Sequence, residues 1–229
     1  MTPMTTAALW MTGAIVSFTS MAVAGRLVRV DLNTFEIMMY RSYLGVIVVL
    51  ILACAFGTLK HINTRHMGLH TVRNLAHFTG QNLWFYALPL IPLAQLFALE
   101  FTSPIWVVLL APIFLGERLT SRKLAIAALG FIGVLIVARP TVDTISLGVL
   151  AAAGAAIGFA GAAIVTRQLT KTEKITCVLF YLTAMQAVFG TIMAAWFGPI
   201  SLPTADTAPG LIIIGIAGLC AHFCLTKAL

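Results

Sequence analysis

Charge is what this chain has least of. Only 9% of its 229 residues are Asp, Glu, Lys or Arg, whereas soluble domains carry about 25%. Hydrophobic residues make up 60% of the chain. Because so few charges cannot cover so much apolar surface in water, the composition excludes an ordinary soluble protein. It predicts an all-α, polytopic membrane protein.

The motifs of common enzymes and of ATP-driven pumps are also absent. The sequence has no phosphate-binding loop, no nucleophile elbow and no His and acidic residues at metal-ligand spacing. We therefore predict no enzymatic activity, no cofactor and no resident metal. Cys220, His222 and Cys224 are close in sequence, but residues two apart on a helix face nearly opposite sides. The cysteines are interpreted as structural thiols in apolar runs, and because the N-terminus has no basic start and no cleavage site after a short apolar core, we expect no removable signal peptide.

Apolar runs of membrane-spanning length recur eight times in the chain. The predicted spans are 5–25, 34–56, 70–88, 91–115, 121–139, 146–168, 175–197 and 208–229. The net charge of +7 comes from Lys and Arg between these runs, which indicates orientation and not nucleic-acid binding. With a cytoplasmic N-terminus, ten basic residues lie inside and three outside. We predict that both termini are cytoplasmic.

The chain also repeats itself weakly at an offset of 141 residues. This offset pairs Gly13 with Gly154 and Phe18 with Phe159, and further pairs follow without a gap. The first repeat, 5–140, contains five spans, and the second, 146–229, contains three. Because five is an odd number, the second repeat enters the membrane from the opposite side. The pattern predicts two inverted repeats, an architecture that many transporters use.

The run from Pro104 to Pro140, PIWVVLLAPIFLGERLTSRKLAIAALGFIGVLIVARP, resembles the end of an EamA-type unit of the drug/metabolite transporter superfamily. The matching features are the proline, the GER-LT turn and the Gly-rich span that closes on Arg-Pro. The resemblance implies ten spans in two inverted repeats, cytoplasmic termini and a central cavity for small metabolites. It covers the first repeat and the second repeat as far as its third span, so spans nine and ten are expected to be missing.

An acid inside the fourth predicted span is the leading functional candidate. Glu100 lies near the middle of the run 91–117, and Pro104 follows four residues later. Because proline has no backbone N–H, the carbonyl of Glu100 loses its helix partner. A charge in mid-membrane costs at least about 2.5–3.5 kcal/mol, so we expect Glu100 to bind a solute or a proton. The alternative is a static ion pair or a protonated, hydrogen-bonded acid.

Three polar residues on neighbouring spans are predicted at a similar depth: Arg41, Gln81 and Asn82. At about 1.5 Å rise per residue, Glu100 lies about 14 Å below the predicted outer face, and the other three lie about 10 Å below it. We predict that the four line one polar pocket, in which Arg41 binds a carboxylate or tunes the pKa of Glu100. Structural pairing of Arg41 and simple interhelical hydrogen bonds of the two amides are the alternatives.

A polar stripe on the third span adds further candidates. Arg73, His77, Gln81 and Trp84 are spaced to share one helical face. We add His77 and Trp84 to the substrate-binding set, together with Ser103 beside Pro104. The alternatives are a packing role for His77 and a place in the interfacial aromatic belt for Trp84.

These observations predict a secondary transporter of small polar metabolites in the cytoplasmic (inner) membrane, working by alternating access. The resemblance favours export over import. The alternative is a truncated, non-transporting remnant of such a transporter. The expected partners are a small-molecule solute and the lipid bilayer, and a homodimer is left open.

Overall fold

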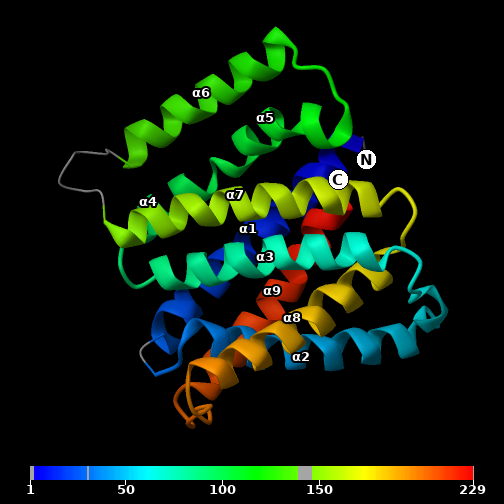
Figure 1. The fold of residues 1–229 in the computed structure, drawn as a ribbon, viewed down its shortest axis with the longest axis vertical. Coiled ribbons are helices and arrows are strands. Elements are labelled where there is room, and N and C mark those ends of the chain that lie inside the picture. Colours follow the sequence, from blue (N-terminus) through cyan, green and yellow to red (C-terminus); the bar gives the residue numbers. More distant parts are fainter. Residues whose placement is uncertain (1–2, 30, 139–145, 229) are drawn as a thin grey trace. The chain divides into compact units, whose positions relative to one another are not determined.

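The computed structural model describes residues 3–29, 31–138 and 146–228, and these residues form helices and turns with no β-strand among them. The helices labelled in Figure 1 are α1 Pro3–Val28, α2 Thr34–Ala55, α3 Met67–Ala87, α4 Leu93–Glu100, α5 Ser103–Leu115, α6 Ser121–Ala138, α7 Leu147–Leu169, α8 Ile175–Phe197 and α9 Ala208–Ala228. A short 3₁₀ helix, η1, covers Leu59–His61. Within the described ranges, six stretches are long and apolar enough to cross a membrane, with α4 and α5 counted as one. The predicted all-α, polytopic membrane fold is confirmed.

The fourth predicted span, 91–115, is the one that the structure divides in two. α4 ends at Glu100, and α5 begins at Ser103. Pro104 lies in the first turn of α5, where a missing N–H is tolerated because that turn has no intrahelical acceptor. The same proline has no N–H to offer the carbonyl of Glu100, so the helix cannot continue through it unchanged. The missing hydrogen bond was predicted from the sequence, and the structure shows a two-residue interruption at Phe101 and Thr102, whose backbone stays close to the right-handed helical region.

The described helices belong to two compact units. Unit 1 comprises Met1–His70 and Leu169–Leu229, and unit 2 comprises Thr71–Gln168. Unit 1 therefore takes helices from both ends of the chain, and its boundaries differ from those of the repeats predicted at 5–140 and 146–229. The inverted repeat remains a prediction, and two of its limits, Pro140 and Leu229, lie outside the described residues.

In unit 1, α1 packs along α9, and α2 packs against both α8 and α9 (Figure 1). Small residues bring these helices close together. A Cβ atom added to Gly190 of α8 would lie 2.8 Å from the backbone nitrogen of Met39 in α2. A capping box starts α2, because Asn33 accepts the Glu36 N–H and Glu36 accepts the Asn33 N–H. Glu36 also accepts the backbone N–H of Ser201 at 2.6 Å, which joins the start of α2 to the α8–α9 connection.

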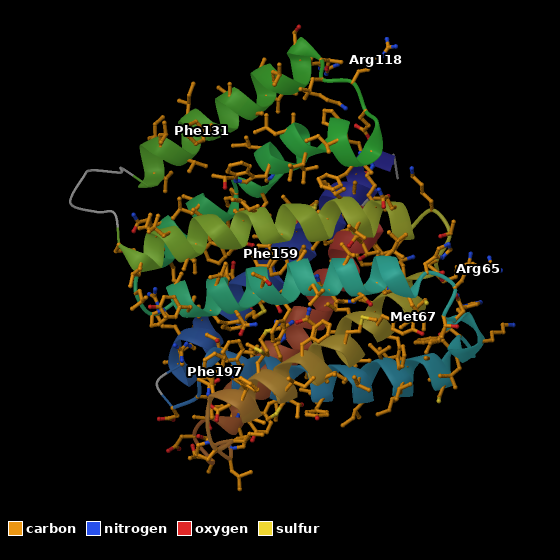
Figure 2. All side chains as sticks on the ribbon, viewed as in Figure 1. Arg65, Met67, Arg118, Phe131, Phe159 and Phe197 are labelled. Carbon is orange, nitrogen blue, oxygen red and sulfur yellow. The ribbon has the colours of Figure 1, made fainter. Side chains whose placement is uncertain are left out.

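In unit 2, α3 and α7 cross at glycines, and α6 packs against α4 and α5. A Cβ atom on Gly158 of α7 would lie 2.9 Å from both the Ala76 carbonyl oxygen and the Gly80 Cα of α3. Phe159, labelled in Figure 2, lies directly beside Gly80. The two helices can therefore approach this closely only because neither carries a side chain at the crossing. Phe131 on α6, also labelled in Figure 2, is 47% exposed.

Candidate functional site

Glu100 is the last residue of α4, directly before the helix break. Two residues later, the Thr102 hydroxyl donates to the Leu99 carbonyl at 2.7 Å. At the start of α5, the Ser103 hydroxyl donates to the Ala156 carbonyl of α7 at 3.0 Å. The break is thus stabilised by side-chain hydroxyls that bind backbone carbonyls within unit 2. Such interruptions inside a membrane need protein partners, because lipid offers no hydrogen bonds.

Trp84 of α3 is the direct partner of Glu100. Its indole N–H donates to Glu100 Oε2 at 2.8 Å, and the Trp84 side chain is only 2% exposed. The Phe85 and Phe97 rings pack near it, with centroids 5.1 and 6.4 Å from that of Trp84. An interfacial belt residue would have its polar edge in the headgroup region. The indole N–H of Trp84 points instead to Glu100 inside unit 2, a contact that could not be read from the sequence.

Glu100 has no cationic partner within the described part of unit 2, and none of its hydrogen bonds there reaches Oε1. An unpaired acid in an apolar setting is costly when charged. It is stabilised either by taking a proton or by binding a positively charged group. Both possibilities agree with the role that the sequence predicts for Glu100.

The remaining residues of the α3 stripe are all buried in unit 2. Gln81 is 2% exposed and His77 is 4% exposed, with the His77 ring 5.7 Å from that of Phe159. Arg73 is 4% exposed, and its guanidinium donates to Thr166 and to Asn74. The predicted common face is therefore a buried polar line that ends at Trp84 and Glu100.

Asn82 faces away from this line. It lies two residues from Trp84, and such residues point to nearly opposite sides of a helix. Its amide donates to the Phe78 carbonyl at 2.8 Å, and its buried Oδ1 has no hydrogen-bond partner among the described residues. Predicted depth alone places Asn82 with Glu100, because depth along a span does not include the angle around the helix.

Arg41 belongs to unit 1, in the middle of α2. Its side chain is 7% exposed, and Nη1 lies 3.9 Å from the sulfur of Met38. A Cβ atom on Gly218 of α9 would lie 2.5 Å from Arg41 Nη2, so this glycine provides the space for the guanidinium. Both oxygens of Glu36 accept backbone N–H groups of Asn33 and Ser201. The pocket that would join Arg41 to Glu100 remains a prediction.

Unit 1 also has a groove of about 780 Å³ between α1 and α9. Thr19 and Ser20 lie on its α1 side, and Asp31 and Asp206 also line it. None of the seven predicted site residues lines this groove. The sequence analysis did not single it out, because isolated acids in connecting segments are ordinary solvated groups.

Unit 1 also contains a cluster of three polar side chains that the sequence does not predict. His70, Glu173 and Cys177 are buried together, although more than a hundred residues separate the first from the other two. Burial acts to raise the pKa of Glu173, but hydrogen bonds from His66, Asn63 and Cys177 outweigh it and hold that pKa below its usual value. Short spacings in the sequence cannot indicate this cluster, because its members are distant along the chain and meet only in the fold.

Comparison with known proteins identifies the family. Residues 5–139 match the EamA-like transporter family. The chain belongs to this family. It is 30% identical over 204 residues to a riboflavin transporter of Brucella anthropi. The matched region covers 87% of this chain and 72% of the relative. The EamA-like chain is therefore a multi-pass membrane protein of a transporter family whose solutes are small molecules, and the family assignment indicates a transporter, not an enzyme.

Other relatives carry different solute names. An S-adenosylmethionine uptake transporter of Rickettsia bellii is 28% identical over 221 residues, covering 96% of this chain and 74% of the relative. A pseudopaline exporter of Pseudomonas aeruginosa is 27% identical over 195 residues, covering 84% and 67%. One solved crystal structure has a TM-score of 0.72 at 21% identity, covering 98% of this chain and 78% of that chain, which shows a shared fold alone.

Proposed function

We propose that this EamA-like protein is a secondary transporter that moves small polar metabolites across the cytoplasmic membrane by alternating access. Glu100 is its central binding group, and it takes either the cationic part of the solute or a coupling proton. The observation that carries this proposal is the position of Glu100 at a break in a membrane helix, with Trp84 as its one hydrogen-bond donor in the described part of unit 2.

The energetic cost of placing an acid inside the membrane is the first support for a functional role of Glu100. A carboxyl group within a membrane span is expensive, and such groups are characteristic of solute and proton pathways. The second support is the broken helix, since interrupted spans bring polar backbone groups to binding sites in many transporters. In unit 2, the Trp84 indole donates to Oε2 of Glu100, and no described residue of that unit donates to Oε1, which we propose binds the solute or the proton.

The other predicted residues receive supporting roles in the proposal. Gln81 and His77 continue the buried face that leads to Trp84, and Ser103 fixes the start of α5 on α7. Arg41 and Asn82 stay in the proposed solute-binding set on their predicted depth in the membrane alone. The buried Oδ1 of Asn82 has no partner among the described residues, but it lies on the side of α3 away from Trp84, so its proposed contact is separate from that of Glu100.

The names of the relatives suggest which solutes to test first. Riboflavin and S-adenosylmethionine are the solutes named for two relatives that this chain covers by more than two thirds. The family resemblance favours export, while the relatives include both an uptake transporter and an exporter. Flux should therefore be measured in both directions.

The test is flux through the purified protein in lipid vesicles, with and without a pH gradient. Glu100→Gln keeps an acceptor for the Trp84 indole but removes the charge and the proton site, so we expect it to fold and to lose most of the flux. Glu117→Gln, in the α5–α6 turn, is the matched control and should transport normally. Equal flux by Glu100→Gln and the unmodified protein, in both conditions, would remove Glu100 from the mechanism. A folded unmodified protein that moves none of these solutes in either direction would contradict the transport proposal for them and favour the non-transporting alternative.

A further inference from the structure

Three chemically reactive side chains meet in unit 1 where two connections come together. One connection runs from η1 to the start of α3, and the other joins α7 to α8. Arg65 and Met67, labelled in Figure 2, mark this end of α3. His70 comes from α3, Glu173 from the turn before α8, and Cys177 from the first turn of α8. The ligand atoms of these three residues all lie within 4.8 Å of one another.

The local structure explains why the three converge. Glu173 and Cys177 are four residues apart, and Cys177 bonds back through its N–H to the Lys174 carbonyl as α8 begins. The chain therefore presents the carboxyl and the thiol toward the same side. His70 is in the first turns of α3, with its ring 4.5 Å from that of Tyr181 on α8. This ring contact holds the imidazole against α8.

The sulfur–nitrogen distance is close to that in a transition-metal site. The Cys177 sulfur lies 3.9 Å from His70 Nε2. In a tetrahedral zinc site with Zn–S of about 2.3 Å and Zn–N of about 2.0–2.1 Å, the sulfur and the nitrogen are about 3.6 Å apart. An ion would therefore need to draw these two atoms together by only about 0.3 Å. His70 and Cys177 are fully buried, and Glu173 is 7% exposed, so the ligands are shielded from competing water.

A second layer of residues fixes the carboxyl group. His66 Nδ1 lies 2.7 Å from Glu173 Oε1, and the Asn63 side-chain amide donates to Glu173 Oε2 at 2.7 Å. Metal-binding carboxylates and imidazoles are commonly oriented by such neighbouring hydrogen bonds. The His66 side chain is 28% exposed, so a residue that binds Glu173 directly also reaches the surface of the protein.

We propose that His70, Glu173 and Cys177 bind one Zn²⁺ ion, or a divalent ion of similar chemistry, with the fourth position open to water. A thiolate and a carboxylate would neutralise the two positive charges of the ion. Sulfur and nitrogen ligands select zinc or cobalt over magnesium and calcium, which prefer oxygen. The ion would tie the start of α3 to the start of α8 within unit 1. Without it, the same residues form only a hydrogen-bonded contact between two turns.

The test begins with protein purified on a tag that contains no histidine. Metal analysis after dialysis should find about one zinc per chain, and titration of metal-free protein with Co²⁺ alone should produce the near-ultraviolet band of a cobalt–thiolate bond at one equivalent. Cys177→Ser should lose this band and bind cobalt at least tenfold more weakly. Cys220→Ser, which removes an exposed thiol of α9, should keep both properties.

A third measurement covers the case in which Cys177→Ser does not fold. A variant with Cys54, Cys220 and Cys224 replaced by serine retains Cys177 as its one thiol, so a cobalt–thiolate band in it must come from Cys177. Zn²⁺ should also raise the melting temperature of metal-free protein, while Mg²⁺ should not. Less than about 0.1 zinc per chain together with no cobalt–thiolate band would overturn the proposal, as would an unchanged band in folded Cys177→Ser.

Discussion

At the scale of single residues, the hydrogen bond from Trp84 to Glu100 makes a prediction about stability. Trp84→Phe keeps most of the ring packing but removes the indole N–H, so a partly buried carboxyl loses its donor in unit 2. We expect the free energy of unfolding to fall by about 1–3 kcal/mol. Denaturant unfolding in detergent measures this change. Trp196→Phe is the control, because Trp196 is 82% exposed, and equal effects of the two variants would contradict the assigned contact.

Glu117 makes a prediction about pH at the same scale. The hydrogen bond from Lys123, together with Arg167, holds the pKa of Glu117 below its usual value. A carboxyl whose pKa is lower in the folded state stabilises the fold above its unfolded pKa of about 4.3 and loses this contribution as the pH falls through the lower value. The protein should therefore melt above Glu117→Gln at pH 7, and the gap should close in acid. Because the pair is exposed, salt should also reduce the gap. A gap that stays constant across pH and salt would contradict this account.

Single residues also show where sequence reasoning stops. An acid and a proline four residues apart were enough to predict a functional role for Glu100 and the loss of a backbone hydrogen bond in its helix. The partner Trp84 was not predicted, because which face of α3 turns toward α4 depends on packing. Asn82 was grouped with Gln81 for the same reason, since adjacent residues share a depth but point about 100° apart around the helix.

At the scale of helices, the α3–α7 crossing depends on two glycines. Gly158→Ala would place a methyl group 2.9 Å from backbone atoms of α3, which cannot move aside as a side-chain end can. We expect a loss of about 1–3 kcal/mol in unfolding free energy, as for other overpacked sites. Gly133→Ala on α6 meets no atom within 4 Å and should stabilise its helix by up to about 1 kcal/mol. Opposite signs of the two effects support the crossing, and a stabilising Gly158→Ala would contradict it.

The helices themselves were largely predictable, and their contacts were not. Long apolar runs bounded by prolines and charges are sufficient to place helices, because a membrane allows little else. Gly-xxx-Gly spacings are common in apolar chains, so Gly154 and Gly158 did not indicate which helix lies opposite. The cluster of His70, Glu173 and Cys177 shows the same limit, because it exists only once His70, in the first turn of α3, lies beside the start of α8 within unit 1.

At the scale of the whole molecule, the chain order and the packing order differ. The offset of 141 residues predicts two repeats that follow each other in sequence. The compact units instead join α1 and α2 to α8 and α9, while α4, α5 and α6 stay together in unit 2. An internal offset compares local composition along the chain, and it does not indicate which helices bury their faces against each other. The repeat and the unit boundaries therefore describe different properties.

Contacts within unit 1 determine which connections share a side of the membrane. Asn63 and His66, which follow η1, bind Glu173 in the α7–α8 turn. At the other end of these helices, Glu36 and Tyr40 of α2 bind Ser201 in the α8–α9 connection. Each pair of connections must lie on one face, because a hydrogen bond of 2.6–2.7 Å cannot cross a bilayer. These contacts support the predicted alternation of spans across the membrane. They do not show which face is cytoplasmic, which is predicted from the distribution of Lys and Arg.

The charge count predicts that direction, and labelling can check it. Ten Lys and Arg lie on one predicted side and three on the other, and the richer side should be cytoplasmic. Lys60→Cys in η1 and Ala205→Cys before α9 are introduced separately into a chain that keeps only the buried Cys177 of its native thiols. A membrane-impermeant maleimide should label Ala205→Cys in intact cells, and Lys60→Cys only after the membrane is opened. Because the side with Lys60 also holds His66 and Glu173, the reversed pattern would contradict the predicted orientation and would place the proposed metal cluster on the outer side.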